Sequence, residues 1–453
     1  MRFLLILLMA LAVQAQQPNF IVIFADDLGY GDLGAYGDPT IATPNLDRMA
    51  AEGQKWTNFY VGACVCTPSR AALLTGRLPI RSGMLHDRIR VLFPESYGGL
   101  QHSEVTIAEV LKQKDYATAA VGKWHLGHLP EFLPMQQGFD SYFGIPYSND
   151  MDRVPSSPRG RAAFWNPKNE YWNVPLMRDE EIIERPAQQE TITKRYTEEA
   201  LKFIRRSKDK PFFLYLAQTM VHVPLFASEK FDGKSRRGLY GDTIEEIDWS
   251  VGQILDTLLE LDLDERTMVV FTSDNGPWLT FDTHGGSAGM LREGKGSTWE
   301  GGMREPGIFW WPGKIKPGTI HEMGATMDLL PTIAKFAGVK APTDRILDGY
   351  DLSGVLTAHQ KSPRNEVIYY RGTSVWAARM GSWKAHFKTK SGYRRDAILE
   401  HDPPLLYNLD HDPREKFDRA AENSQVIDSI KKMVAAHVES VKPVENQLAR
   451  INR

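Results

Sequence analysis

The sequence has only two cysteines among its 453 residues, Cys64 and Cys66. A disulfide across the one residue between them would be strained, so the chain has no disulfide framework. Neither sign of charge dominates, because 54 Lys and Arg residues stand against 57 Asp and Glu residues. This balance excludes a polybasic nucleic-acid-binding protein and a charged, disordered tail. The composition is that of a globular protein with a sizeable core.

Long apolar runs are absent after the N-terminus. Residues 1–15, MRFLLILLMALAVQA, place Arg2 before an apolar run that ends in small residues, which is the pattern of a secretory signal peptide. The run is shorter than the roughly 20 apolar residues that a membrane span needs, and no cysteine follows it to carry a lipid anchor. We therefore expect an exported protein, periplasmic or secreted, without a membrane anchor.

Short apolar runs alternate with amphipathic segments from residue 19 to about residue 340, which is typical of βαβ units around a largely parallel sheet. After that point the runs become shorter. The pattern predicts strands at 19–24, 117–121, 212–216, 267–272, 367–370, 375–379 and 383–387, and helices at 44–52, 243–261 and near 425–438. We expect an α/β domain at 16–355 and a small α+β domain at 356–453.

Two of the predicted strands end in adjacent oxygen ligands. Asp26 and Asp27 follow the strand at 19–24, and Asp274 and Asn275 follow the strand at 267–272. Each pair alone is also typical of a turn. In an open α/β sheet, however, ligands bind beyond the carboxyl ends of the strands, so the two pairs together favour one cation site. Hard oxygen donors select Ca²⁺ or Mg²⁺ over Zn²⁺.

A distinctive motif stands between these pairs. Cys66-Thr67-Pro68-Ser69-Arg70, followed by Leu-Thr-Gly-Arg at 74–77, resembles the signature of the type I sulfatases. The resemblance covers nearly the whole chain and is strongest toward the arylsulfatase A and N-acetylgalactosamine-6-sulfatase branches. Its further blocks are FADDLGYGDLGAYG, TPNLDRMAAEG, GKWHLG, GIPYS, HVP, SDNG, GKGSTWEGGMREP and LLYNLDHDPRE.

The resemblance implies a fold like that of the alkaline-phosphatase superfamily. Its features are a large mixed, mostly parallel sheet between helices and a smaller C-terminal α+β domain. The implied reaction is hydrolysis of sulfate monoesters, and we expect a sulfated carbohydrate as substrate.

Residue 66 has the central role in the reaction that the resemblance implies. A dedicated maturation enzyme would convert Cys66 to formylglycine (3-oxoalanine), whose hydrate supplies the nucleophile. Formylglycine would also touch a Ca²⁺ held by Asp26, Asp27, Asp274 and Asn275. Such groups suit a sulfate ester, because its charge repels anionic nucleophiles and must be offset by cations.

Three further candidates surround the nucleophile. Arg70 follows Cys66 by four residues in a predicted helix, which places both on one face. Lys123 and His125 follow the strand at 117–121 and would alternate onto one side. By resemblance, Arg70 holds the nucleophile, Lys123 binds it and the sulfate, and His125 is a base. In the alternative without a catalytic role, Arg70 is solvated or serves only the maturation enzyme, and His125 is structural.

Three more candidates belong to the sulfate and its leaving group. His222 lies in TMVHVP, Lys295 in a glycine-rich segment and Ser148 in GIPYS. By resemblance, His222 protonates the departing alkoxide, Lys295 stabilises charge on the bridging oxygen, and Ser148 donates a hydrogen bond to sulfate. The glycine-rich segment alone is weak evidence, because it lacks the spacing of a nucleotide-binding loop.

Two segments, 82–96 and 148–153, match no pattern tied to one specificity, and we expect substrate choice to reside there. Asp87, Arg88 and Asp150 are candidate sugar contacts, since carboxylates and guanidinium groups suit paired hydroxyls. Taken alone, each is more typical of a solvated surface. Weaker candidates for the rim of the site are His86, His128, His284, Arg371 and Trp376, whereas Cys64 is expected to be a packed or exposed spectator thiol.

Two other functions compete with the sulfatase hypothesis. Related formylglycine sites also process phosphorus esters, so the chain could be a phosphonate or phosphodiester hydrolase. It could also be a glycan-binding pseudoenzyme in which Cys66 stays a thiol. The complete set of candidate catalytic residues argues against the second alternative, and the sequence predicts no particular oligomeric state.

Overall fold

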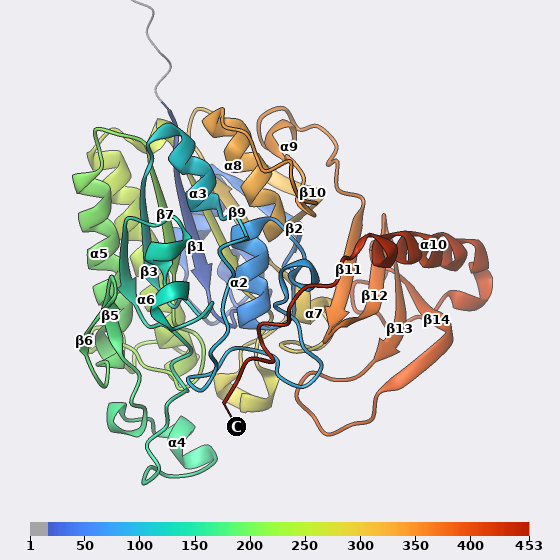
Figure 1. The fold of residues 1–453 in the computed structure, drawn as a ribbon, viewed down its shortest axis with the longest axis horizontal. Helices are drawn as coiled ribbons and strands as arrows, with labels where there is room; N and C mark the ends of the chain where they lie inside the picture. Colours follow the sequence, from blue (N-terminus) through green and yellow to red (C-terminus); the bar gives the residue numbers. More distant parts are fainter. Residues whose placement is uncertain (1–16, 453) are drawn as a thin grey trace, which may run out of the picture.

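A central ten-stranded sheet organises the computed structural model, which describes residues 17–452 (Figure 1). The signal peptide predicted at residues 1–15 lies outside these residues. The strand order is β10-β2-β9-β8-β1-β7-β3-β4-β5-β6. The strands are β1 (Asn19–Ala25), β2 (Gln54–Tyr60), β3 (Ala117–Gly122), β4 (Ser141–Gly144), β5 (Leu176–Arg178), β6 (Glu181–Glu184), β7 (Phe212–Ala217), β8 (Thr267–Ser273), β9 (Arg304–Trp310) and β10 (Gly318–Ala325).

The middle of the sheet is parallel. Strands β8, β1, β7, β3 and β4 run in one direction, whereas β9, β5 and β6 pair antiparallel with their neighbours. All seven residues of β1 are buried, because helices cover both faces of a parallel block. Its apolar run NFIVIFA therefore shows no polar alternation.

The side chains of β1 point alternately into two hydrophobic cores, one on each face of the sheet. Ile21 and Ile23 pack with α1 (Pro44–Glu52), α5 (Ile192–Arg206) and α6 (Leu239–Glu260). Phe20, Val22 and Phe24 point to the other face, as the period of two in a strand requires. That face packs against α2 (Cys66–Thr75), α3 (Ile107–Leu111), α8 (Leu329–Ala337) and α9 (Ser353–Ala358).

A second, antiparallel sheet lies beside the large one, with α10 (Ser424–Ser440) packed against it (Figure 1). Its strands are β11 (Glu366–Arg371), β12 (Ser374–Met380), β13 (Trp383–Thr389) and β14 (Leu399–Asn408). The predicted α/β class, with a mostly parallel sheet and a small C-terminal α+β unit, is confirmed. The boundary predicted between residues 355 and 356 falls inside α9 and stays a prediction.

Long connections carry short helices beyond the carboxyl ends of the parallel strands. α4 (Arg161–Trp165) lies between β4 and β5, and the 3-10 helix η9 (Leu279–His284) and α7 (Glu300–Met303) lie between β8 and β9. Figure 1 shows α4 and α7 at the lower edge of the sheet, toward which β1 points. Within residues 17–452, no helix has the length and apolar content to cross a bilayer.

Candidate active site

The predicted site residues converge at the carboxyl edge of the parallel block. Adjacent parallel strands end at the same edge, where open α/β sheets bind ligands. Cys66 opens α2 beside this edge. The other side chains follow successive strands of the block: Asp26 and Asp27 after β1, Lys123 and His125 after β3, Ser148 after β4, His222 after β7, and Asp274 and Asn275 after β8.

Cys66 lies at the centre of this group. Ligand atoms of Asp26, Asp27, Cys66 and His222 all lie within 4.8 Å of one another. Burial raises the pKa of the Cys66 thiol to about 12, although Lys123 and other cations nearby oppose the rise. An unmodified thiol here stays protonated at neutral pH and is a weak nucleophile. The position suits a residue that gains its nucleophile by modification.

The four predicted metal ligands form one buried cluster. The backbone N–H of Asp27 donates to Asp274 Oδ1 at 3.1 Å, and Asn275 Nδ2 donates to Asp27 Oδ1 at 2.7 Å. Asp26 Oδ1 and Asn275 Oδ1 are buried and have no hydrogen-bond partner among the described residues. Buried oxygens without partners are costly, and a hard cation would satisfy them. The cluster therefore fits Ca²⁺.

The charge of the cluster also fits a cation. Burial raises the pKa of Asp27 to about 6 and that of Asp274 to about 7, and the neighbouring Asp26 carboxylate adds to both shifts. Burial would raise the pKa of Asp26 as well, but Lys123, Arg70 and Lys295 hold it well below its usual range. Positive charge bound among these carboxylates would favour their ionised forms.

Two buried cations brace the carboxylates. Arg70 donates from Nε and Nη2 to Asp274 Oδ2 at 3.0 and 2.8 Å, and from Nη1 to the carbonyl of Lys123 at 2.9 Å. Lys123 Nζ lies 2.5 Å from Asp26 Oδ2 and 3.2 Å from Ser148 Oγ. Arg70 is fully buried, so the solvated alternative for this residue is wrong.

His125 reaches the site by a route that the sequence did not predict. Simple alternation fails because the chain leaves the extended conformation at Gly122 (φ 112) and His125 (φ 58). His125 Nε2 lies 2.9 Å from the carbonyl of Leu92, and Nδ1 is buried without a hydrogen-bond partner within residues 17–452. Donation from Nε2 leaves Nδ1 as a free acceptor. Burial and Lys123 lower the pKa of His125 well below its usual value, so the neutral ring suits a base.

His222 and Lys295 both lie close to the Asp27 carboxylate. Lys295 Nζ is 2.7 Å from the Asp27 carboxylate, and His222 Nε2 is 3.7 Å from Asp27 Oδ2. The other ring nitrogen of His222 lies 2.6 Å from the carbonyl of Val223 and 3.2 Å from Asn149 Oδ1. Asn149 was not predicted, although it is adjacent to Ser148. Burial and Lys295 lower the pKa of His222 well below its usual value.

The C-terminal unit shapes the loop that carries Lys295. Gly392 packs against the Lys295 carbonyl, and the next residue, Tyr393, has its ring stacked beneath the Arg90 guanidinium at 4.6 Å. Arg90 in turn donates to the carbonyl of Gly296 at 2.8 Å. Arg371, expected at the rim, instead donates to the carbonyls of residues 390–392 and lies 4.8 Å above the Trp376 ring.

A buried ion network joins the C-terminal sheet to α7. Lys384 Nζ on β13 lies 2.9 Å from Glu300 Oε1 and 3.0 Å from Glu415 Oε1. Glu415 also accepts from the Glu300 backbone N–H at 2.8 Å and lies 2.6 Å from His386 Nε2. Lys384 and Glu300 are fully buried. The only sequence signal was a lysine and a histidine within the strand WKAHFKT, which identifies no partner.

The three candidate sugar contacts lie in different settings. Asp87 Oδ1 accepts from the backbone and hydroxyl of Thr373, both at 2.8 Å, so this carboxylate is tied to the C-terminal sheet. Arg88 is exposed. Asp150 Oδ1 is buried and has no hydrogen-bond partner in the described part of the chain. Burial raises the pKa of Asp150, although Lys123 and Lys295 oppose the rise. Asp150 is therefore the one near the catalytic cations.

The weaker candidates are held by local packing. His284 stacks on Trp165 with ring centres 5.1 Å apart, and His128 meets Tyr147 edge-on at 5.7 Å. The backbone N–H of Ile89 donates to His86 Nδ1 at 2.9 Å. Cys64 is a free, buried thiol in an apolar cluster.

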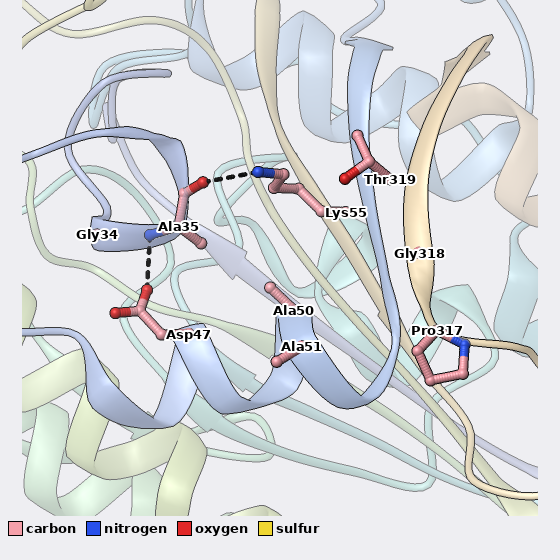
Figure 2. Close-up of a pocket in the computed structure, with 9 residues that line it drawn as sticks. All are labelled: Gly34, Ala35, Asp47, Ala50, Ala51, Lys55, Pro317, Gly318 and Thr319. Carbon is pink, nitrogen blue, oxygen red and sulfur yellow. Dashed lines mark hydrogen bonds between the residues drawn. The ribbon is translucent and has the colours of Figure 1, made fainter.

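A separate surface hollow of about 490 Å³ is lined by residues of the 3-10 helix η1 (Gly34–Tyr36), α1, β2 and the start of β10. Figure 2 shows these residues. Its polar groups bind one another. Asp47 Oδ1 accepts from the Ala35 backbone at 2.7 Å, and Lys55 donates to the Ala35 carbonyl at 3.1 Å. None of the candidate catalytic side chains lines this hollow, so it has no part in the site above.

Comparisons with known proteins place these residues in a family context. Residues 18–339 match the sulfatase family model, and residues 362–453 match the model of the C-terminal region of aryl-sulfatase. The chain is 43% identical to human arylsulfatase A, covering 92% of this chain and 86% of the relative. It is 41% identical to N-acetylgalactosamine-6-sulfatase of Canis lupus familiaris, covering 96% and 88%.

A solved structure supports the same relationship. The sulfatase PsFucS1 from Pseudoalteromonas sp. superposes with a TM-score of 0.84 at 30% identity, over 97% of this chain and 92% of that chain. The fold expected from the sequence motifs is therefore confirmed at the level of the whole chain.

Proposed function

The chain belongs to the sulfatase family and is a sulfuric ester hydrolase, and we propose that it acts on sulfated carbohydrates with formylglycine at position 66 and one bound Ca²⁺. One observation carries this proposal. Cys66 opens α2 beside buried, unpartnered oxygens of Asp26 and Asn275 and beside Lys123 and Lys295. That arrangement provides a nucleophile position, a cation site and fixed positive charge in one place.

Formylglycine and Ca²⁺ would supply separate parts of the chemistry. Formylglycine, as its hydrate, would provide a hydroxyl nucleophile and a second hydroxyl that lets the covalent sulfate leave. Ca²⁺, held by Asp26, Asp27, Asp274, Asn275 and residue 66, would neutralise charge on sulfate. The carbohydrate class rests on the relative named N-acetylgalactosamine-6-sulfatase.

The residues around position 66 would prepare and release the nucleophile. Arg70, anchored to Asp274, fixes positive charge behind the attacking oxygen without needing to reorganise. Lys123 is placed by Asp26 and Ser148, and its ammonium would bind the sulfate. His125, neutral and with a free Nδ1, would accept the proton of the second hydroxyl.

His222 and Lys295 would serve the departing alcohol. Lys295 places positive charge beside the bridging oxygen as negative charge develops there. His222 is neutral without substrate, since burial and Lys295 lower its pKa, and a bound sulfate would raise that pKa by its negative charge. Substrate binding would thus charge the imidazole that protonates the leaving group.

Sulfate-release assays on sulfated monosaccharides and oligosaccharides test the proposed function, using protein co-expressed with a formylglycine-generating enzyme. Peptide mass spectrometry should show the cysteine-to-aldehyde mass change at residue 66. Sulfate release should depend on this change and disappear in Cys66→Ala, which keeps the fold. Equal turnover by unmodified protein would refute the mechanism, and faster release of phosphate from phosphodiesters would favour the phosphorus-ester alternative.

Export is a separate part of the proposal. Residues 1–15 have the pattern of a signal peptide. N-terminal sequencing of protein recovered from the periplasm or medium should therefore start after this segment. Recovery of the full-length chain from the cytoplasm alone would contradict export.

A further inference from the structure

A row of aromatic rings leads away from the catalytic cations. The Trp278 ring lies 5.4 Å from the His222 ring and 4.3 Å from Lys295 Nζ. Phe281 follows with its ring centre 4.7 Å from Trp278, and Trp165 lies 5.6 Å beyond Phe281. The row thus joins the leaving-group side of the site to η9 and then to α4. The mechanism above does not require the two outer rings.

The outer end of this row opens into a surface hollow of about 500 Å³ between α4 and η9. Trp165 and Phe281 line it, together with Arg161 and Asp282. Arg161 Nη2 lies 3.0 Å from Asp282 Oδ2, and its guanidinium also stacks 4.3 Å above the Trp165 ring. Both charged side chains are about two-thirds exposed, at 69% and 67%. The hollow therefore places aromatic rings, one of them beneath the Arg161 guanidinium, next to an open ion pair.

The backbone at Asp282 is unusual. Its φ of 59° and ψ of −121° interrupt the helical conformation of η9. Such a conformation is unfavourable for a residue with a side chain, and it often occurs where a side chain is aimed for function. Here it presents the carboxylate to Arg161 at the edge of the hollow.

The chemistry of the hollow matches a pyranose ring. One face of such a ring is a set of C–H groups that packs on an aromatic surface, while its hydroxyls are paired donors and acceptors. A guanidinium and a carboxylate side by side can bind both kinds of hydroxyl group. Arg237, which donates to the Thr283 carbonyl at 3.0 Å, adds positive charge nearby that would attract an anionic glycan.

We propose that the hollow is an outer sugar site, formed by Trp165, Phe281, Arg161 and Asp282, which binds a second residue of a sulfated oligosaccharide whose sulfate ester lies at Cys66. This inference rests on the proposed function, and it means that the substrate has at least two sugar residues. An apolar aglycone fits the hollow less well, because hydrocarbon would cover the Arg161–Asp282 pair without replacing its hydrogen bonds to water. Sugar hydroxyls would replace them.

The test compares two substrates that share one sulfated residue. One probe is the sulfated monosaccharide that the sulfate-release assays show to be cleaved fastest. The other is a tetrasaccharide that carries the same sulfated residue. For 6-sulfated N-acetylgalactosamine, this tetrasaccharide is derived from chondroitin 6-sulfate. The measured quantity is the ratio of kcat/KM for the tetrasaccharide to kcat/KM for the monosaccharide. We expect Trp165→Ala and Arg161→Ala each to lower this ratio about tenfold.

The C-terminal unit offers matched control variants. Phe417 is 65% exposed in another surface hollow, and Arg419 there pairs with Glu422 at 3.4 Å. Phe417→Ala and Arg419→Ala should leave the ratio unchanged within about twofold. An equal ratio in Trp165→Ala and Phe417→Ala would overturn the outer sugar site while leaving the sulfatase function intact.

Two further outcomes would also be decisive. If a sulfated galactolipid is preferred to the tetrasaccharide and this preference is lost in Trp165→Ala, the hollow binds an apolar aglycone and the sugar assignment is overturned. If the modified protein releases no sulfate from any sugar, the proposed function itself fails, and the outer site fails with it.

Discussion

Replacing Lys384 with methionine would test whether the buried ion network holds the C-terminal unit against α7. Lys384 Nζ contacts Glu300 and Glu415 and lies 4.1 Å above the Tyr369 ring. Methionine keeps much of the length and apolar surface of lysine but removes the charge. Two buried carboxylates would then lose their shared cation.

The expected loss in the free energy of unfolding depends on the partners that Glu300 and Glu415 keep in Lys384→Met. Removing one partner of a buried ion pair typically costs about 3–5 kcal/mol. Glu300 would keep Arg304 at 3.5 Å and the hydroxyls of Tyr60 and Tyr369, and Glu415 would keep His386. We therefore expect the lower end, a loss of about 3 kcal/mol in the free energy of unfolding.

The pKa of Glu300 also predicts that Lys384→Met lowers the free energy of unfolding. Burial alone would raise the pKa of Glu300, but Lys384, Arg304 and Arg379 hold it well below its usual range. Without Lys384 the ionised carboxylate is less favoured, so the folded protein loses part of the stability that this charge provides at neutral pH.

The assay is urea unfolding at pH 7.5, with Lys388→Met as the control. Lys388 lies on the same strand and pairs with Glu400 at 2.8 Å, but the two side chains are 34% and 71% exposed. An exposed pair contributes about 0–1 kcal/mol, so the control should be nearly as stable as the wild type. Equal losses in the two variants would refute the reasoning.

A double variant keeps the test informative if Lys384→Met does not fold. Glu300→Gln combined with Lys384→Met removes charge from both members of the pair. It should recover part of the stability lost in the single variant, because the remaining amide needs no buried counter-charge. A double variant no more stable than Lys384→Met would show that the ion pair does not cause the loss.

Three other predictions concern the catalytic groups and pH. His222→Ala should slow an alkyl sulfate about a hundredfold or more but an activated aryl sulfate much less; equal slowing would deny His222 the acid role. Chelation of the metal should remove activity and lower Tm. Adding Ca²⁺ at 100 times its Kd should restore about 2.7 kcal/mol in the free energy of unfolding. If chelation changes neither activity nor Tm, the metal site is contradicted. Burial lowers the pKa of His386 from 6.5 to about 4 despite Glu415, so the unfolded chain takes up this proton first as pH falls. Stability should then drop by up to about 3 kcal/mol between pH 6.5 and 4, and His386→Gln should show a smaller drop in urea unfolding at the two pH values.

The parallel core could be predicted because its strands are continuous apolar runs. NFIVIF and TMVVFT predict buried strands without knowledge of their neighbours. Strand β9 begins with Arg-Glu-Pro, and β14 contains Pro403 and Pro404, so both look like turns by their residue types. Tertiary pairing with β2, β8 and β13 forms these strands, and a local pattern does not contain that information.

The same reasoning separates two halves of the active site. Asp26, Lys123, Asp274 and their neighbours directly follow predicted strands, so the sequence alone brings them to one edge of the sheet. Trp278, Tyr393 and Trp165 lie in long connections and in the C-terminal unit. Their proximity arises only from contacts such as Trp278 with Tyr393, whose ring centres are 4.9 Å apart.

The sulfate side and the leaving-group side of the active site are built from different parts of the chain. The sulfate side depends on strand ends, which the core holds rigidly, and transition-state stabilisation benefits from such fixed groups. The leaving-group side depends on η9, α4 and the loop at Tyr393, whose sequences can change without disturbing β1 or β8. Arg371 holds the loop that carries Gly392, which packs against the Lys295 carbonyl, and Lys384 ties the small sheet to α7. Changes in the small sheet would therefore reach the substrate without moving the nucleophile. Substitutions that alter substrate choice should therefore concentrate in these connections, whereas substitutions at Asp26, Lys123 or Asp274 should remove sulfate hydrolysis for every substrate.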